Sequence, residues 1–524
     1  MKRRKFIKTS SSGILAPAII NGIPLQDFGL SEFNPKDEND HVLILIYLEG
    51  GNDGLNTLIP LDQLDNLNRA RGNITMKESS LLKINGNNKL MLHPSLSGFQ
   101  TLYNENKLCI VQSVGYPIPS FSHVISTNIW ASAKNEGDEF NNGWLGRFLS
   151  LNHPGFPENY PNSTNPDPLV IQFDVNLPLL FQGTNGQMSM RIGKDGSNIF
   201  KEWPNALNEP VDNSRRGREL NNIRTISRLS NSYSQSIIEA YVKGINVVNY
   251  PSDNNLGNYL QVIARLIKGG SKTRVFLVNI PGFDTHSSQV DASDKTKGLH
   301  SNLLKTLGDA VLSFQRDLEG LNIADRVIGM TFSEFGRRIQ SNTILGTDHG
   351  AAAPLFLFGS KINGGIIGSN PTIPSSVGYY DNLPMQYDFR SIYTSVLKDW
   401  FCVQNPELTS IMLKPYPLLP IIKSDCNSNA VNDLKNIEEK LSIVVTPNSV
   451  VQQAKITISS IKGQAQIQLF DYMGRMCKLI FSGKLEEGTH TFIFENENYS
   501  VGNYYLRLQQ GTAQRIEPLI IIKL

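Results

Sequence analysis

Two of the chain's eight histidines stand beside carboxylates in short loops next to apolar runs. His286 follows Asp284 by two residues, and His349 directly follows Asp348. An i, i+2 pair at the end of a strand can aim both side chains into one cleft. Carboxylate and imidazole together form the donor set of a hard or borderline divalent metal. We therefore predict that these four residues bind zinc, calcium or manganese; a hydrogen-bonded loop or turn is the alternative.

Two more acidic residues lie at comparable places and are predicted as further metal ligands. Asp53 follows a glycine pair after the first apolar run, and Glu334 follows a later run. Each has a structural alternative. The residues around Asp53 also form a natural turn, and Glu334 could pair with Arg337 or Arg338 as a structural ion pair.

A nucleophile and its base are predicted at Ser122 and His123, which open a predicted helix after the second apolar run. The amino end of a helix favours an anionic ester and lowers the effective pKa of a nucleophile placed there. A plain helix cap is the alternative role for Ser122. Arg147 and Arg337 are predicted to clamp an anionic substrate, because guanidinium groups bind such anions in pairs of hydrogen bonds.

Composition excludes several other classes of protein. The net charge of +2 is too small to indicate the strongly basic surface of a nucleic-acid-binding protein. Gly50-Gly51 is not followed by the Lys and Ser/Thr of a phosphate loop, so we predict no nucleotide cofactor. No apolar run reaches the roughly 18 residues of a membrane span. The four widely spaced cysteines suggest little reliance on disulfides, with a Cys402–Cys426 bridge as the less favoured alternative.

Buried strands and amphipathic helices must position these loops. Continuous apolar runs, typical of strands buried on both faces, occupy 41–48, 108–114, 274–280, 326–331 and 354–358. One face of a long helix runs from Leu299 to Leu318, between two of these runs, and predicts a βαβ unit with a parallel pair. We expect an α/β domain over 41–420 with a doubly wound, mostly parallel sheet, whose sites lie beyond the carboxyl ends of its strands. The polar, helical residues 200–260 are predicted to form a cap or insert.

Both ends of the sequence resemble targeting signals. Residues 1–30 have the basic start and weakly apolar stretch of a signal peptide, and Arg3-Arg4-x-Phe6-Ile7-Lys8 resembles the twin-arginine signal. An ordinary Sec signal is the alternative. We expect export through the periplasm to the cell surface or medium.

A polar linker is predicted over 421–440, and short alternating segments separated by turn residues predict a small β-sandwich over 441–524. Its strings resemble the type IX secretion sorting domain of Bacteroidetes, among them QLFDYMGR and the terminal apolar strand ending IKL. The usual Tyr-Pro-Asn-Pro is reduced to Thr-Pro-Asn-Ser. That resemblance implies the type IX machinery as a partner; a carbohydrate-binding or spacer sandwich is the alternative.

The α/β domain resembles the bacterial family catalogued as domain of unknown function 1501. The resemblance rests on GGNDGLNT, LHPSL, GWLGR, DTH, MTFSEFGRR and GTDHG, in that order over residues 41–405. This family is similar to the alkaline phosphatase and sulfatase superfamily, whose members bind one or two divalent metals and hydrolyse phosphate or sulfate esters.

The superfamily's ligands carry over only in part. Its middle Asp and His resemble Asp284 and His286, which stand closer together than usual, and its late histidine resembles His349. Its Asp-His-Gly falls on Glu334-Phe335-Gly336, where Phe335 cannot ligate. Its first-strand aspartate falls near Asp53 and its nucleophile at Ser122. The sulfatase signature Cys/Ser-x-Pro-x-Arg is not found.

The resemblance implies an exported metal-dependent hydrolase of phosphate or sulfate esters, with an anionic polysaccharide as a reasonable substrate. A surface binding or assembly protein that kept the fold and lost catalysis is the second hypothesis, favoured by Phe335. A metal held only for structure is the third.

Overall fold

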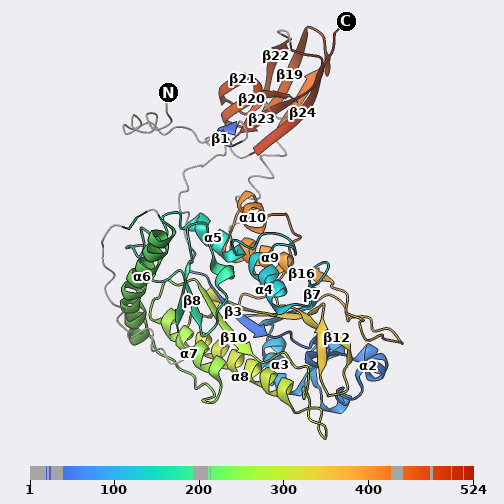
Figure 1. The fold of residues 1–524 in the computed structure, drawn as a ribbon. Helices are drawn as coiled ribbons and strands as arrows, with labels where there is room; N and C mark the ends of the chain where they lie inside the picture. The colour runs from blue at the N-terminus through green and yellow to red at the C-terminus, as the bar shows by residue number, and fades with distance from the viewer. Residues whose placement is uncertain are drawn as a thin grey trace. The chain divides into compact units, whose positions relative to one another are not determined.

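The computed structural model forms two compact units, Met1–Ser424 and Asp425–Leu524 (Figure 1). It describes residues 19–20, 23–24, 39–192, 211–212, 214–426, 441–471, 476–496, 499–510 and 513–523. The predicted signal and linker lie mostly outside these residues. Within those two segments, only the strands β1 (Ile19–Ile20) and β2 (Ile23–Pro24) and residues 421–426 are described.

A mostly parallel sheet forms the centre of the first unit (Figure 1). In the described residues its order is β15-β7-β14-β11-β3-β10-β8-β9, and β16 also pairs with β7. Strand β14 runs antiparallel to β7 and β11, and the other pairings are parallel. The strands are β3 (Val42–Glu49), β7 (Leu108–Gly115), β8 (Val170–Phe173), β9 (Ser189–Ile192), β10 (Val275–Pro281), β11 (Val327–Phe332), β14 (Ala353–Phe358), β15 (Gly365–Ile367) and β16 (Tyr387–Asp388).

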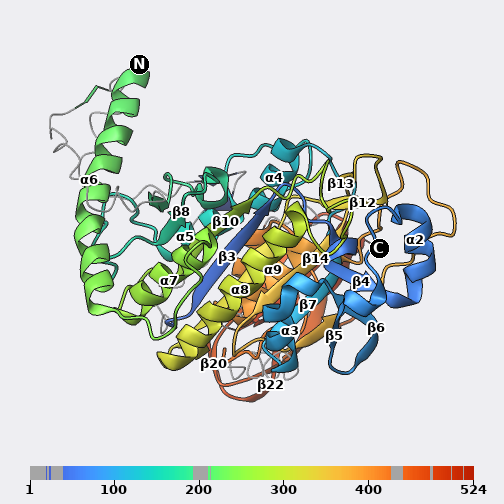
Figure 2. The ribbon, with the colours of Figure 1, turned by 90° about the horizontal axis from the view of Figure 1, so that it is seen from below.

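Helices cover both faces of this sheet (Figures 1 and 2). Alternate residues of β3 belong to two different cores, with Ile44 and Ile46 in one and Leu43 and Leu45 in the other. The first core also holds residues of α3 (Ser97–Asn104), α7 (Asn255–Lys268) and α8 (Leu299–Gly320). The second holds residues of α4 (His123–Ser132), α5 (Trp144–Asn152), α9 (Phe389–Asp399) and α10 (Asn405–Met412). The predicted doubly wound α/β fold is confirmed.

The predicted βαβ unit is β10-α8-β11, and one detail of it differs from expectation. Its two strands are parallel, but they do not pair with each other, because β3 lies between them and pairs with both. The apolar run of β3 is buried on both faces, as a central strand requires. The carboxyl ends of β3, β10 and β11 therefore meet at one edge of the sheet.

Smaller elements surround the sheet. Helix α6 (Arg215–Lys243) lies in the polar segment predicted as an insert, and Tyr233 and Ile237 anchor it to the core of α7 and α8. Strands β12 and β13 form a two-stranded ribbon beyond β11. The other elements are α1 (Gly54–Thr57), β4 (Leu58–Pro60), α2 (Leu64–Arg71), β5 (Leu82–Ile84), β6 (Asn87–Leu92), β12 (Gly336–Ser341) and β13 (Thr347–Gly350).

The second unit is a β-sandwich. One sheet has the order β17-β19-β22 and the other β18-β24-β23-β20-β21. Their inward residues, such as Ile456 and Leu506, share one core. The strands are β17 (Ser442–Thr446), β18 (Ser449–Val450), β19 (Gln453–Ser460), β20 (Gly463–Asp471), β21 (Met476–Leu485), β22 (Gly488–Glu495), β23 (Gly502–Gln510) and β24 (Ala513–Ile521). The predicted all-β module is confirmed.

Disulfide bonding of Cys402 and Cys426, the alternative that the sequence analysis favoured less, is present in the structure. Cys109 is a buried thiol and Cys477 an exposed thiol. Within the described residues, no helix combines the length and the apolar character needed to cross a bilayer.

Helix α8 offers a matched test of the packing that supports the site. Leu307 is completely buried, whereas Leu299 on the same helix is 52% exposed. We expect Leu307→Ala to lower the free energy of unfolding by about 2–5 kcal/mol, because it leaves a cavity under the sheet. Leu299→Ala should change it by less than about 0.5 kcal/mol. Equal losses in chemical denaturation would contradict this placement of α8.

Candidate functional site

The candidate residues lie in loops at the carboxyl ends of the parallel strands. Asp284 and His286 follow β10, Glu334 follows β11, and His123 begins α4 beyond β7. The β12–β13 ribbon brings in His349, which is the register partner of Arg337. Four segments of the sequence therefore meet at one edge of the sheet.

Close packing between two of these loops depends on glycine. Gly50, directly after β3, has a φ of +120°, and a Cβ there would lie 2.2 Å from the backbone nitrogen of Asp284. A side chain at this position would push the Asp284 loop outward. The glycine pair after the first strand thus serves loop packing, since only glycine adopts this conformation without strain.

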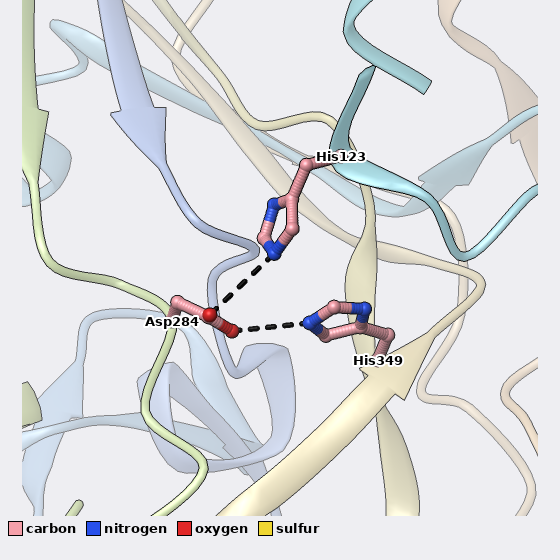
Figure 3. A group of neighbouring side chains, drawn as sticks. All are labelled: His123, Asp284 and His349. Carbon is pink, nitrogen blue, oxygen red and sulfur yellow. Dashed lines mark hydrogen bonds and ion pairs between the residues drawn. The ribbon is translucent and has the colours of Figure 1, made fainter. Parts of the chain in front are cut away.

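Three side chains converge at the centre of the site (Figure 3). One ligand atom from each of His123, Asp284 and His349 lies within 4.8 Å of the other two. The Nε2 atom of His349 is 3.1 Å from Asp284 Oδ1, and the Nε2 atom of His123 is 3.5 Å from Asp284 Oδ2. The two imidazoles therefore approach the two oxygens of one carboxylate.

His286 joins the same group. Its Nε2 atom lies 3.1 Å from Asp284 Oδ1 and 2.9 Å from the Nε2 atom of His349. Two imidazole nitrogens at this distance cannot both carry a proton. Either one of them donates a hydrogen bond to the other, or both direct lone pairs at a shared cation.

The outer nitrogen of each imidazole has its own oxygen acceptor. His123 Nδ1 is 2.8 Å from Glu334 Oε1, and His286 Nδ1 is 2.7 Å from Asp348 Oδ1. His349 Nδ1 is 2.8 Å from the carbonyl oxygen of Phe121. An ionised carboxylate or a carbonyl can only accept, so each Nδ1 carries the proton. In the neutral imidazoles all three Nε2 atoms are then bare acceptors, and they face Asp284.

Glu334 and Arg337 form the buried base of the site. Glu334 accepts hydrogen bonds from the Gly50 backbone nitrogen at 3.0 and 3.2 Å as well as from His123. The Arg337 guanidinium donates to the backbone oxygens of Gly50, Gly51, Phe283 and Thr347. It also donates to Asp284 Oδ1 at 2.7 Å. These contacts tie the loops after β3, β10 and β11 into one rigid frame.

Asp284 stays ionised in this frame. Partial burial raises its pKa, but the hydrogen bond from Arg337, together with the neighbouring imidazoles of His349 and His286, outweighs burial and brings the pKa down to about 2. The hydrogen bond with Glu334, opposed by burial, raises the pKa of His123, whereas burial lowers the pKa of His349. The site therefore contains a permanent anion among imidazoles of unequal basicity.

This donor set fits a divalent cation. One ligand atom from each of His123, Asp284 and His349 lies close enough to the others to hold one ion, and the Nε2 atom of His286 borders this group. Imidazole nitrogen and carboxylate oxygen are ligands that zinc and related metals take. Each imidazole is oriented through Nδ1 by a carboxylate or a carbonyl, which is the usual outer support of a metal-binding histidine. His123, Asp284 and His286 remain about 40% exposed, so an ion and a substrate can reach them.

The structure places Asp53 in a different cluster. Both of its carboxylate oxygens lie 2.8 Å from Arg71 Nη1, and Gln289 donates to Oδ2 at 2.6 Å. Asp53 and Arg71 are each 1% exposed. Burial raises the pKa of Asp53, but Arg71 and His300 outweigh it and lower the pKa overall. The carboxylate is thus fully engaged in a buried ion pair.

Three other candidates serve local structure. Ser122 is the N-cap of α4, its Oγ accepting from Ile125 N at 3.5 Å, and it is exposed. Arg147 donates to backbone oxygens of Ile411, Asn142 and Ser132. Burial lowers the pKa of Arg147 to about 10. The donors of Arg337 point at Asp284 and at backbone oxygens, as described above, so neither guanidinium is aimed at a substrate.

Some members of the site carry no signal in the sequence. The carbonyl of Phe121 holds His349, and the hydroxyl of Tyr379 donates to Asp348 Oδ2 at 2.5 Å. A carbonyl contact has no residue preference, and Tyr379 lies in a loop without a motif. Phe335, expected from its position to replace a ligand, lies beside His349 and His123, with ring centroids 4.4 and 4.9 Å apart.

The Asp53 cluster predicts a stability effect that is separate from metal binding. Asp53→Ala should lower the free energy of unfolding by about 3–5 kcal/mol at neutral pH, because it leaves Arg71 buried without a partner. Since the folded pKa of Asp53 is lowered, the difference from the parent should shrink as the pH falls below about 4. Chemical denaturation at several pH values measures it.

Asp309→Ala is the control for that experiment, because Asp309 pairs with Lys305 on the surface of α8. It should cost less than about 1 kcal/mol. Equal effects of the two substitutions would mean that the Asp53–Arg71 pair is not buried in the folded protein.

Comparison with known proteins gives a partial family match. The model of a family described as "Protein of unknown function (DUF1501)" matches residues 253–382. The match includes Asp284, His286, Glu334 and His349, and it is shorter than the span of the motifs in the sequence. No curated protein matches the chain.

Solved structures match weakly. A protein of the alkaline phosphatase superfamily from Vibrio parahaemolyticus is 8% identical, with a TM-score of 0.33, over 91% of this chain and 82% of that one. A sulfatase of Bacteroides thetaiotaomicron glycosaminoglycan metabolism is 10% identical, with a TM-score of 0.32, over 87% and 90%. The lipoteichoic acid synthase LtaP of Listeria monocytogenes is 11% identical, with a TM-score of 0.28, over 63% and 68%. These scores carry no inference about the site.

Proposed function

We propose that the site binds a divalent cation and that the protein hydrolyses an anionic ester. The observation that carries the proposal is the convergence of three imidazole Nε2 atoms on Asp284, each on a ring whose Nδ1 faces an oxygen acceptor. Without a cation, two of these nitrogens face each other at 2.9 Å, and both lie 3.1 Å from a carboxylate oxygen. A bound positive ion turns this repulsion into attraction, because every one of these atoms then has a partner.

The ligands in this proposal are His123, Asp284, His286 and His349. Glu334 and Asp348, predicted as ligands from the sequence, instead hold His123 and His286 from behind. His123, predicted as a catalytic base, takes a ligand role because its Nε2 atom points at Asp284. Arg337 fixes Asp284 and offsets its charge, which leaves the ion's positive charge less neutralised for an anionic substrate.

The expected chemistry is hydrolysis of a phosphate or sulfate ester. A divalent cation at this place would polarise an ester oxygen and lower the pKa of water. The four ligands would hold that ion, and the buried base keeps them rigid. Water, or Ser122 in a first step, would attack the phosphorus or sulfur atom, and the bond from that atom to the ester oxygen would break. The alcohol would leave with the proton given up by the attacking group, and a phosphate or sulfate carried by Ser122 would be released by a second attack from water. Ser122→Asn distinguishes the two, because it keeps a capping side chain and removes the hydroxyl.

For location and substrate, we propose export through the twin-arginine and type IX routes to the cell surface or medium. The end segments of the sequence support this route, and the disulfide-bonded Cys402 and Cys426 suit an oxidising compartment. An exported ester hydrolase meets polymers outside the cell, so an anionic polysaccharide is the substrate class that we propose.

A non-catalytic binding protein is the second candidate. The observation that favours it is Phe335, which is 2% exposed and packs against the rings of both His123 and His349. An aromatic ring there closes off a place where a second metal could be held. A one-metal site that binds an anion without turnover would have this appearance.

Metal content tests the proposal directly. We expect about one equivalent of zinc or manganese in the purified protein, and its loss in the double variant Asp284→Asn/His349→Ala. Calcium should not replace these ions, because it prefers oxygen ligands to imidazole nitrogens. His490→Ala is the control, because His490 is a half-buried histidine of β22 in the second unit and its substitution should leave the metal in place. Elemental mass spectrometry provides the measurement. An absence of metal from folded parent protein supplied with both ions would refute the site.

Turnover separates the two candidate functions. If metal binds and a phosphate or sulfate ester is hydrolysed by the parent but not by the double variant, the hydrolase is supported. If metal binds and a panel of such esters is left intact, the binding protein becomes the better account.

Glu334 tests the supporting role of the buried base. Glu334→Gln keeps the size of the side chain but removes the charge that holds the Nδ1 proton of His123. We expect metal affinity to fall by about ten- to a hundredfold, the usual effect of losing such an outer partner. Titration with a competing chelator measures this. An unchanged affinity, with the fold intact, would show that His123 is not a ligand.

A further inference from the structure

We propose that Arg338, Tyr379 and Tyr380 form a subsite that binds a negatively charged sugar unit of the substrate. The proposal rests on the hydrolase function above and names the part of the substrate that the metal cluster does not hold. None of these three residues was singled out as a site residue from the sequence.

The subsite is one carboxylate away from the metal cluster. The hydroxyl of Tyr379 donates to Asp348 Oδ2 at 2.5 Å, and the other oxygen of Asp348 is 2.7 Å from His286 Nδ1. Arg338 Nε also donates to the backbone oxygen of His349 at 3.2 Å. A ligand that covers the two tyrosines therefore lies next to the residues that would hold the ion.

The two tyrosine rings are unusually exposed for neighbours of a candidate site. Tyr379 is 49% exposed and Tyr380 75%, and their centroids are 5.0 Å apart at nearly a right angle. An aromatic ring has a negative face, on which the C–H groups of a sugar ring pack well. Exposed apolar surface beside a site marks a place of binding. The open position suits a polymer, whose neighbouring units must extend past the site.

Arg338 gives the subsite a positive charge. Its guanidinium carbon lies 4.7 Å from the centroid of Tyr379 and 4.8 Å from that of Tyr380. Nη1 makes a long hydrogen bond of 3.4 Å to the backbone oxygen of Tyr379, and Nη2 makes none to any residue that the structure describes. The two rings hold the cation in place while donors remain available for a sulfate, phosphate or carboxylate group.

The nearby carboxylate does not remove this preference for anions. Asp348 is already shared between His286 and Tyr379. The carboxylate thus remains an acceptor that is committed to the cluster, and Arg338 is the neighbour whose donors are still open.

Calorimetric titration of the metal-loaded protein tests the subsite. The probes are a size-defined sulfated oligosaccharide and the same oligosaccharide after desulfation. Tyr380→Ala should weaken binding of the sulfated probe about three- to tenfold, the worth of one aromatic contact. Arg338→Gln should reduce its affinity to that of the desulfated probe. Tyr505→Ala, at a 42% exposed tyrosine of the C-terminal unit, is the control and should bind as the parent does.

Three results would overturn the subsite: no binding of the sulfated probe, equal binding of both probes by the parent, or unchanged binding by both variants. Metal content measured on the same samples keeps the two proposals apart. A metal-loaded protein that fails these titrations retains the proposed cation site and loses only the subsite. Thermal unfolding of each variant confirms that the fold is intact.

Discussion

The site depends on one constraint, the direction in which each imidazole carries its proton. Oxygen acceptors fix the Nδ1 protons of His123, His286 and His349, so their Nε2 lone pairs face Asp284 and, for His286 and His349, each other. Such an arrangement of bare acceptors costs free energy unless a cation or a shared proton lies among them. The rest of the structure can be understood as the support that holds these rings against their mutual repulsion.

That support comes from the topology of the sheet. Strand β3 lies between β10 and β11, so their carboxyl ends deliver Gly50, Asp284 and Glu334 to one place. Arg337 then joins their loops through hydrogen bonds to backbone oxygens. A buried guanidinium with all of these acceptors is costly to move, which makes the position of Asp284 a property of the fold rather than of one loop.

The sequence predicts the fold well and the site in part. Apolar runs and the periodicity of α8 identify the buried strands and the doubly wound arrangement, because burial on both faces leaves a direct trace in composition. The approach of His286 to His349 could be expected from Asp-His spacing at strand ends. Two other features could not be expected from the sequence: the ion pair of Asp53 with Arg71, and the exchange of roles by which His123 points at Asp284 while Glu334 supports it from behind. These features depend on contacts between residues 18 and 211 positions apart. The insertion of β3 between β10 and β11 is likewise determined by tertiary packing, because the order of the apolar runs in the sequence does not indicate which strands are neighbours in the sheet.

The most direct test is to locate a bound ion by anomalous X-ray diffraction, using crystals of protein that was purified without any chelator. A fluorescence scan identifies the element, and data collected above and below its absorption edge locate it. We predict a single anomalous peak that touches the Nε2 atoms of His123, His286 and His349 and an oxygen of Asp284, at about 2.0–2.2 Å if the ion is zinc. A peak elsewhere, or none at this place while His286 and His349 keep their approach, would contradict the metal centre and leave a shared proton as the explanation.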